Sequence, residues 1–272
     1  MKHFINPTVS RMAFFLLIYG AIISCSGKNE SSESFLLEKG WFIQSSQKTT
    51  SNGEGLSTSF SGLDDWYPAE VPSTVFGSLV NNGVYEDVFF GKNLEKADPE
   101  DFQCPWWYRT SFRVSENSPS THILEFDGII FRANIWLNGR KIASADTVEG
   151  AFRQYSINVS NIIRTDEDNF LAVEVFPPIA GDLTVGFVDW NPEAPDRGMR
   201  IWREVRLRSS GDVSLRYPFV VTKLDTSSLD NAMLTVSCEA VNNGSRKIAG
   251  YMHVNINDEI ALKKKVSGLN IK

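Results

Sequence analysis

Residues 132–145, which read RANIWLNGRKIASA, predict a β-hairpin. Apolar and polar residues alternate on both sides of Asn138-Gly139, and a type I′ turn needs a positive φ at both central positions, which Asn and Gly adopt readily. Further strands are expected at 121–127 (THILEFD), 170–176 (FLAVEVF) and 201–208. Many short strands separated by polar turns predict an all-β chain arranged as a β-sandwich.

One helix is expected before these strands. Ser73 is a suitable N-cap for residues 74–81, and Gly83 stands where the helix would end. The apolar residues that share one face of this helix are Val75, Phe76, Leu79 and Val80. This face is expected to pack against the end of the sandwich.

The pattern of strands changes near residue 213. Four further strands are expected at 213–221, 233–238, 250–256 and 260–266. The residues after 212 are fewer than the roughly 100 that an immunoglobulin-like sandwich takes. We therefore expect a first sandwich domain over 35–212 and only part of an immunoglobulin-like β-sandwich over 213–272.

Composition excludes several classes of function. The formal net charge is −6, and no basic stripe is present that could neutralise a line of phosphates, so nucleic-acid binding is not expected. The three histidines lie far apart and the three cysteines show no paired spacing, at His3, His122 and His253 and at Cys25, Cys104 and Cys238. Neither a metal site, a cofactor nor a disulfide framework is expected.

The first 25 residues have the features of an export signal. Lys2 and Arg11 precede residues 12–24 (MAFFLLIYGAIIS), an apolar stretch shorter than the about 20 residues that span a bilayer. The end of this stretch with Cys25 resembles a bacterial lipobox, in which the leader is cut before a cysteine that is then lipidated. We expect a signal peptide over 1–24, a polar tether over 25–34, and a lipid anchor at Cys25 in the cell envelope, in the periplasm or at the outer membrane. A core helix, or a plain secretory leader with an incidental cysteine, is the alternative.

A long connection separates the strand at 170–176 from the one at 201–208. Residues 177–200 read PPIAGDLTVGFVDWNPEAPDRGMR, and loops of this length in compact domains are often functional. Asp189 beside Trp190 is a plausible sugar contact, because a carboxylate accepts hydrogen bonds from hydroxyl groups and an indole covers the apolar face of a pyranose. The alternative is that Trp190 anchors the loop to the core, as loop tryptophans often do.

Several motifs together resemble the sugar-binding jelly roll that opens enzymes of glycoside hydrolase family 2. They are VPSTV at 71–75, PWWYR at 105–109, IWLNGR at 135–140, NFLAV at 169–173, VDWNP at 188–192 and IWREV at 201–205. The resemblance covers roughly residues 35–210 and is nearest to the exo-β-D-glucosaminidase and β-mannosidase branches. Arg200 departs from the family pattern, in which glycine is more common. The tryptophans expected to serve as core or loop anchors are Trp106, Trp107 and Trp202.

The resemblance implies a role for the long loop. Asp189 falls where the related Asp-Trp loop reaches into the active site and contacts the terminal sugar of a β-linked glycan. Trp190 and Asp196 are further candidate contacts.

The resemblance also implies where catalysis takes place. Family 2 enzymes hydrolyse with retention through two carboxylates held in a TIM barrel that follows the immunoglobulin-like domain. Such a barrel needs about 250 residues of alternating strand and helix. We expect this chain to lack the barrel and any catalytic residue, and to be the inactive front part of an exported retaining β-glycosidase.

Two other functions fit the same residues. The chain could be a lipid-anchored protein that holds glycans without cutting them, or a purely structural lipoprotein of the envelope. The sequence also leaves glucosaminide, mannoside and galactoside open as substrates.

Overall fold

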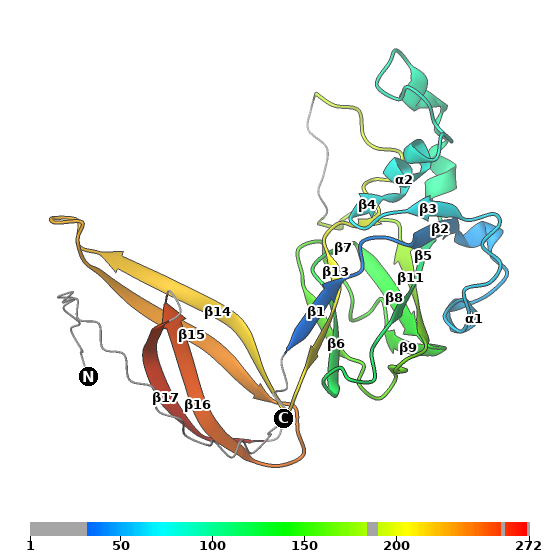
Figure 1. The fold of residues 1–272 in the computed structure, drawn as a ribbon. Helices are drawn as coiled ribbons and strands as arrows, with labels where there is room; N and C mark the ends of the chain where they lie inside the picture. Colours follow the sequence, from blue (N-terminus) through cyan, green and yellow to red (C-terminus); the bar gives the residue numbers. More distant parts are fainter. Residues whose placement is uncertain (1–31, 184–189, 257–258, 271–272) are drawn as a thin grey trace, which may run out of the picture.

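The structure is a computed structural model that describes residues 32–183, 190–256 and 259–270. It is all-β with few helices, as predicted: a β-sandwich is followed by two long β-hairpins (Figure 1). In the part of the chain that is described, no helix is both long and apolar enough to cross a membrane.

The sandwich consists of two antiparallel sheets and a smaller one. The four-stranded sheet has the order β1 (Glu33–Leu36), β13 (Val205–Ser210), β6 (Thr121–Phe126), β10 (Tyr155–Asn158). The six-stranded sheet has the order β3 (Tyr67–Ala69), β2 (Trp41–Ser45), β5 (Trp106–Arg113), β11 (Asp168–Phe176), β8 (Arg132–Leu137), β9 (Arg140–Ala143). The small sheet at one end has the order β4 (Ser73–Thr74), β12 (Arg200–Ile201), β7 (Ile129–Ile130).

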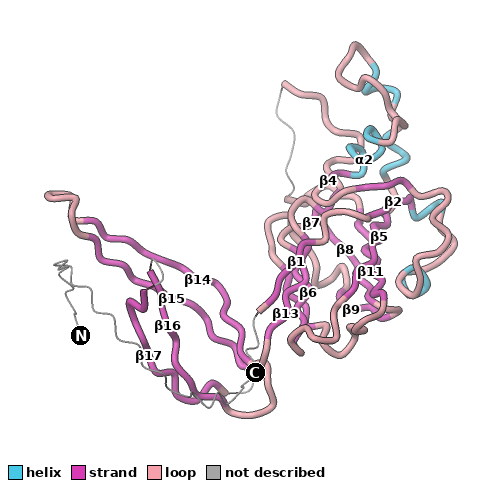
Figure 2. Tube along the Cα trace, viewed as in Figure 1, coloured by secondary structure: helices cyan, strands magenta, loops and turns pink. Residues whose placement is uncertain are grey.

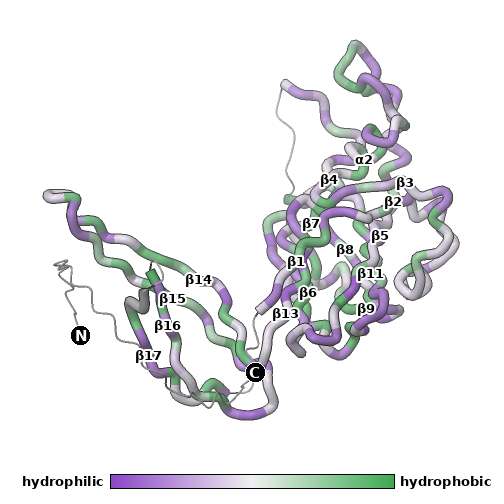
Figure 3. The backbone as a smooth tube through the Cα atoms, viewed as in Figure 1, coloured by the Kyte–Doolittle hydropathy of each residue, from purple (hydrophilic) through white to green (hydrophobic). Residues whose placement is uncertain are grey.

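The core lies between the two larger sheets. Leu124 and Phe126 of β6, with Ile135 and Leu137 of β8, are fully buried, and Val173 of β11 joins them. Hydrophobic and hydrophilic residues are interleaved along these strands, which is the pattern of a sheet with one buried face (Figure 3). The alternation read from the sequence therefore identifies the residues that fill the sandwich.

The predicted hairpin at Asn138-Gly139 is confirmed. Asn138 has φ +51° and Gly139 φ +80°, and these two residues join β8 to β9. The Asn138 side chain also accepts a hydrogen bond from the Phe170 N–H at 2.9 Å, so the turn is fastened to the neighbouring strand β11.

The predicted helix is present as α2 (Val75–Asn81), but its cap is not Ser73. Thr74 is the N-cap, and its hydroxyl accepts a hydrogen bond from the Gly77 N–H at 2.7 Å. Ser73 lies one residue before the cap, where it pairs with Ile201 of β12 in the small sheet. Gly83 ends the helix with φ +71°, as predicted. The remaining helical turns are α1 (Gly53–Leu56), η1 (Ser46–Lys48), η2 (Asn93–Lys96) and η3 (Pro99–Phe102).

The strand expected at 201–208 is instead two strands. β12 pairs with β4 and β7, whereas β13 pairs with β6 and β1 in a different sheet. Between them the Trp202 indole N–H donates to the Ala151 carbonyl at 2.7 Å, and its ring meets Phe152 edge to face. The chain changes sheets at Trp202, which is the loop anchor that the sequence predicted. Trp106 and Trp107 are buried, also as predicted.

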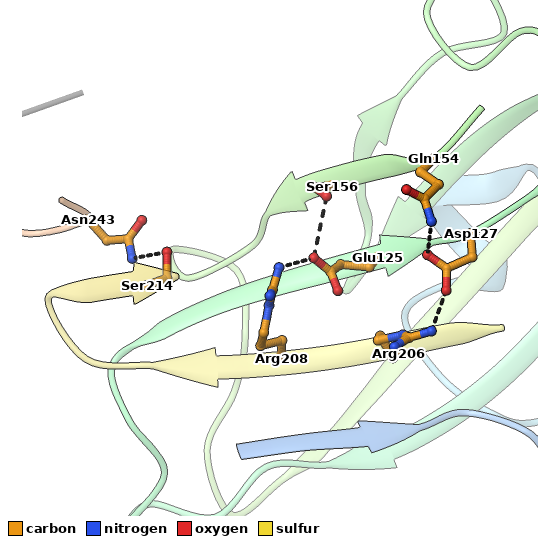
Figure 4. Close-up of polar contacts among 8 residues, drawn as sticks. All are labelled: Glu125, Asp127, Gln154, Ser156, Arg206, Arg208, Ser214 and Asn243. Carbon is orange, nitrogen blue, oxygen red and sulfur yellow. Dashed lines mark hydrogen bonds and ion pairs between the residues drawn. The ribbon is translucent and has the colours of Figure 1, made fainter. Parts of the chain in front are cut away.

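The outer face of the four-stranded sheet carries paired charges (Figure 4). Arg206 of β13 pairs with Asp127, and Arg208 pairs with Glu125 of β6. Each carboxylate has a second partner on the neighbouring segment: the Gln154 amide donates to Asp127 at 3.1 Å and the Ser156 hydroxyl donates to Glu125 at 3.4 Å. Both carboxylates of this face therefore have polar partners, whereas the buried Nε of Arg206 has none among the described residues.

The four strands predicted after residue 212 are present as two hairpins. They are β14 (Val213–Leu224) with β15 (Ala232–Asn242), and β16 (Ile248–Ile256) with β17 (Glu259–Leu269). The Cys238 thiol contacts the Met252 sulfur at 3.4 Å, which joins β15 to β16. Several large apolar side chains remain exposed on the hairpins, among them Leu215, Phe219, Val220, Leu234 and Leu262. The hairpins do not bury a core of their own within the described residues.

Candidate functional site

The long loop leaves the sandwich at the end where the small sheet and α2 lie. It follows the last residue of β11, Phe176, and ends at Arg200, the first residue of β12. Figure 2 shows the described part of this loop near β4, β7 and α2. The exposed large apolar side chains in the described part of the loop are Ile179, Leu183 and Trp190.

The first part of the loop is held by an arginine of the six-stranded sheet. Arg132 donates from both terminal nitrogens to Asp182, at 2.7 and 2.5 Å, and also contacts Glu149 at 3.1 Å. The Asp182 side chain is only 6% exposed. Burial raises the pKa of Asp182, but hydrogen bonds from Arg132 and from the Ile179 N–H outweigh this effect and leave the pKa below its usual value. Asp182 is therefore a carboxylate anchored to the scaffold.

The last part of the loop is held at the start of α2. The Asp196 carboxylate accepts hydrogen bonds from the Phe76 N–H at 2.8 Å and from the Gly198 N–H at 2.9 Å. The Val75 N–H donates to the Met199 carbonyl at 3.1 Å, so backbone as well as side chain joins the two segments. Burial raises the pKa of Asp196 above its usual value, although the hydrogen bonds from the Phe76 and Gly198 N–H groups act to lower it.

The predicted sugar contacts Trp190 and Asp196 differ in how far they are exposed to solvent. Trp190 is 82% exposed, so its indole is not packed into the core and is free to meet a ligand. Asp196 is 1% exposed and bonded to backbone N–H groups, so this placement gives no support to the prediction that it touches sugar. Asp189 and the predicted lipidation site Cys25 lie outside the described residues.

Two residues of this site were not predicted. Arg132 lies where the loop departs because it stands opposite Phe176 in the pairing of β8 with β11, and Glu149 faces Arg132 in an isolated antiparallel bridge. That pairing joins strands that are not consecutive in the sequence, so the hairpin signal alone could not reveal it. Among the described residues, no cluster of His, Cys, Asp or Glu could hold a metal ion.

The two buried acids in the described part of the loop are not arranged as a pair for hydrolysis. Retaining hydrolysis needs two carboxylates about 5–5.5 Å apart that face the sugar. In the described part of the loop, Asp182 is tied to Arg132 and Asp196 to the start of α2, and neither faces solvent. Among the described residues of the loop, the exposed side chains include the aromatic Trp190 and the acidic Glu193.

Comparison with known proteins identifies the family. The family described as glycosyl hydrolase 2 galactose-binding domain-like matches residues 41–186, which is more than half of the chain. The chain belongs to glycoside hydrolase family 2. The jelly-roll assignment and the predicted family are thereby confirmed.

Relatives of the chain are similar over most of its length. It is 38% identical over 210 residues to the exo-beta-D-glucosaminidase of Streptomyces avermitilis, which covers 77% of this chain and 23% of that protein. It is 32% identical over 210 residues to the mannosylglycoprotein endo-beta-mannosidase of Lilium longiflorum, with 66% of this chain and 21% of that protein covered. The crystal structure of the exo-chitosanase of Amycolatopsis orientalis matches with a TM-score of 0.81 at 32% identity, over 88% of this chain and 28% of that one. This family 2 chain thus spans about a quarter of the length of these relatives.

Proposed function

We propose that this chain is the non-catalytic N-terminal part of an exported retaining β-glycosidase of the exo-β-glucosaminidase or β-mannosidase type. The observation that carries the proposal is the 38% identity to an exo-beta-D-glucosaminidase over 210 residues. Because the chain spans only 23% of that relative, we place the two catalytic carboxylates in a barrel that this chain does not contain. The chain alone is then inactive, and its partners are that barrel and a β-linked glycan.

The proposed contribution of the chain to this reaction is to hold the terminal sugar. The exposure of Trp190 supports this role, because an indole left in solvent can cover the apolar face of a pyranose. The neighbouring carboxylate, Asp189, accepts hydrogen bonds from hydroxyl groups and attracts the ammonium group of a protonated glucosamine unit. The acidic net charge of −6 favours the same cationic substrate.

Sugar binding by the isolated chain tests this role. Calorimetric titration with a glucosamine tetramer is expected to show weak binding. Trp190→Ala and Asp189→Ala are each expected to reduce the affinity by about tenfold, because the loss of ring stacking or of one charged hydrogen bond costs about 1–3 kcal/mol. The control is Phe89→Ala, which removes another fully exposed aromatic ring. Binding that is absent, or equally weakened in all three variants, would contradict the proposal.

Hydrolysis is tested on the complete polypeptide that contains this chain. Release of nitrophenol from aryl β-glucosaminide, β-mannoside and β-galactoside identifies the substrate. Activity on at least one of them, with none from residues 1–272 alone, is the expected result. Glycan binding without hydrolysis of any β-glycoside would replace the glycosidase with a binding protein.

We also propose export and lipid anchoring at Cys25. The support is the short apolar stretch at 12–24, preceded by Lys2 and Arg11 and followed by a polar tether. Expression in a bacterial host with labelled palmitate is expected to label the wild-type chain and not the Cys25→Ala variant. Equal labelling of the two, or none of either, would rule out the anchor.

A further inference from the structure

The turn that follows α2 carries two phenylalanine side chains that lie in solvent. Phe89 is 101% exposed and Phe90 is 78% exposed. The other exposed phenylalanines of the described sandwich, Phe35 and Phe152, each lie against another aromatic ring, at 6.1 and 5.6 Å between ring centroids. A phenylalanine side chain can bury about 150–250 Å². The pair therefore forms an apolar patch close in size to the largest that monomeric proteins expose, and such patches are often functional.

The backbone of this turn is held by hydrogen bonds. The Asp87 carbonyl accepts from the Phe90 N–H at 2.8 Å and from the Asn93 side-chain amide at 3.1 Å. The Asn93 N–H in turn donates to the Phe90 carbonyl at 3.1 Å. Val88, next to the two rings, is 9% exposed and belongs to the core of the sandwich. Because the turn is already ordered, a partner that covers the rings loses little affinity to ordering it.

The turn lies at the end of the sandwich where the small sheet is found. Tyr85, at the start of the turn, packs against Phe76 of α2 at 5.1 Å between ring centroids. The Phe76 N–H donates to Asp196, shortly before β12. The segment after α2 projects from the sandwich beyond β4 (Figure 1). The proposed function places the sugar at this end, and this end is then the one that faces the barrel.

The charges around the two rings restrict the kind of partner. Residues 84–101 contain six acidic and two basic residues, and one of the basic ones, Lys92, pairs with Glu95 at 3.7 Å. The anionic surface of a membrane repels a turn of this charge. Two copies that met turn to turn about a twofold axis would bring like charges together. An apolar recess with a basic rim has the complementary charge.

We propose that Phe89 and Phe90 dock this sandwich on the catalytic barrel of the complete polypeptide, in an apolar recess with a basic rim. The inference rests on the proposed function, which supplies the barrel. The matched part covers 23% of the Streptomyces avermitilis glucosaminidase and 28% of the Amycolatopsis orientalis exo-chitosanase, so most of each relative lies outside it. Contacts between domains of one chain commonly bury about 600–1,500 Å², and a few aromatic anchors contribute most of the binding energy of such a contact.

Photochemical cross-linking in the complete polypeptide identifies what covers the rings. A benzophenone analogue of phenylalanine is placed at position 89, and the linked peptides are identified by mass spectrometry. A cross-link within one polypeptide, from position 89 to the barrel, is the expected result. The control is the same probe at position 117, in the exposed turn between β5 and β6, which is expected to give no link to that barrel segment. Links between two copies, links to lipid, or no link from position 89 would each overturn the inference.

The double variant Phe89→Ser with Phe90→Ser tests whether the rings hold the contact. Both side chains are exposed, so the sandwich is expected to fold in this variant. In the complete polypeptide, backbone amides of the barrel segment that position 89 labels are expected to exchange at least about tenfold faster than in the wild type. Phe152→Ser is the matched control, because it removes an exposed phenylalanine outside the turn. Unchanged exchange in the double variant, or an equal rise in Phe152→Ser, contradicts the docking contact.

The same polypeptide separates this inference from the proposed function. If it hydrolyses an aryl β-glycoside but position 89 labels nothing in the barrel, the docking contact is wrong and the proposed function stands. If position 89 labels the barrel but no β-glycoside is hydrolysed, the proposed function is wrong and the docking contact stands. A complete polypeptide without a barrel would overturn both.

Discussion

Asn138 offers a sharp test of how the hairpin is held in the sandwich. Its side-chain amide donates to the Ile162 carbonyl at 2.9 Å and to the Asn169 side chain at 2.8 Å, and its oxygen accepts from the Phe170 N–H at 2.9 Å. The residue also has φ +51°, in the left-handed region. Asn138→Ala removes the three hydrogen bonds and puts a strained residue in the turn, whereas Asn138→Gly removes only the hydrogen bonds.

The magnitudes follow from these contacts. Three hydrogen bonds contribute about 1 kcal/mol each to stability, so the glycine variant is expected to lose about 3 kcal/mol. A left-handed conformation costs a residue with a Cβ about 1–2 kcal/mol, so the alanine variant is expected to lose about 4 kcal/mol or slightly more. For a domain of this size, 1 kcal/mol lowers Tm by about 2–4 °C, which gives falls of about 9 °C and 13 °C.

Thermal unfolding followed by circular dichroism and calorimetry measures both variants. Urea unfolding provides the free energies, and an unchanged m-value shows that the denatured state is unaffected. If the alanine and glycine variants were equally stable, the argument from the turn conformation would be wrong. If both lost less than about 1 kcal/mol, the three hydrogen bonds would not be contributing as described.

Two further predictions concern packing and pH. Gly53→Ala is expected to destabilise the sandwich by about 1–3 kcal/mol in urea unfolding, because a Cβ there would lie 2.2 Å from the Trp136 ring. Gly55→Ala in the same helix is the control, since its new Cβ meets nothing closer than 3.6 Å. Equal losses of stability in the two variants would refute the explanation. Burial lowers the pKa of His122, whose Nδ1 lies 2.9 Å from the Ser209 hydroxyl, so the unfolded chain takes up the proton more readily. Its contribution to stability is therefore present above the unfolded pKa of about 6.5 and is lost as the pH falls below it. The unfolding free energy of the wild type is expected to fall between about pH 6.5 and 5 more steeply than that of His122→Asn, and parallel curves would refute this assignment.

The sequence revealed the parts of the fold that depend on local patterns. Asn138-Gly139 predicted its hairpin because few residues adopt two successive positive φ values. Gly83 predicted the end of α2 for the same reason. The cap of that helix was placed one residue too early, at Ser73, because Ser and Thr are both good caps and the two residues are adjacent.

The candidate site was predictable only in part. The length of the loop at 177–200 and its Asp-Trp pair singled it out, and Trp190 is indeed exposed. The sequence could not show that Asp196 is buried, because its partners at Phe76 and Gly198 come together only when β12 joins β4. Arg132 escaped notice for a similar reason, since an arginine at the start of a strand normally faces water.

By itself, then, the sequence determined the strand periods, the turns and the family, because each depends on residues close together in the chain. Tertiary structure alone decided which carboxylates of the loop are tied to the scaffold. Antiparallel pairing of β8 with β11 sets Arg132 beside the departing loop, and the pairing of β12 with β4 buries Asp196 at the start of α2. These contacts join residues 50 and 120 positions apart, and a charge is held in such a place only when folding provides its hydrogen-bond partners.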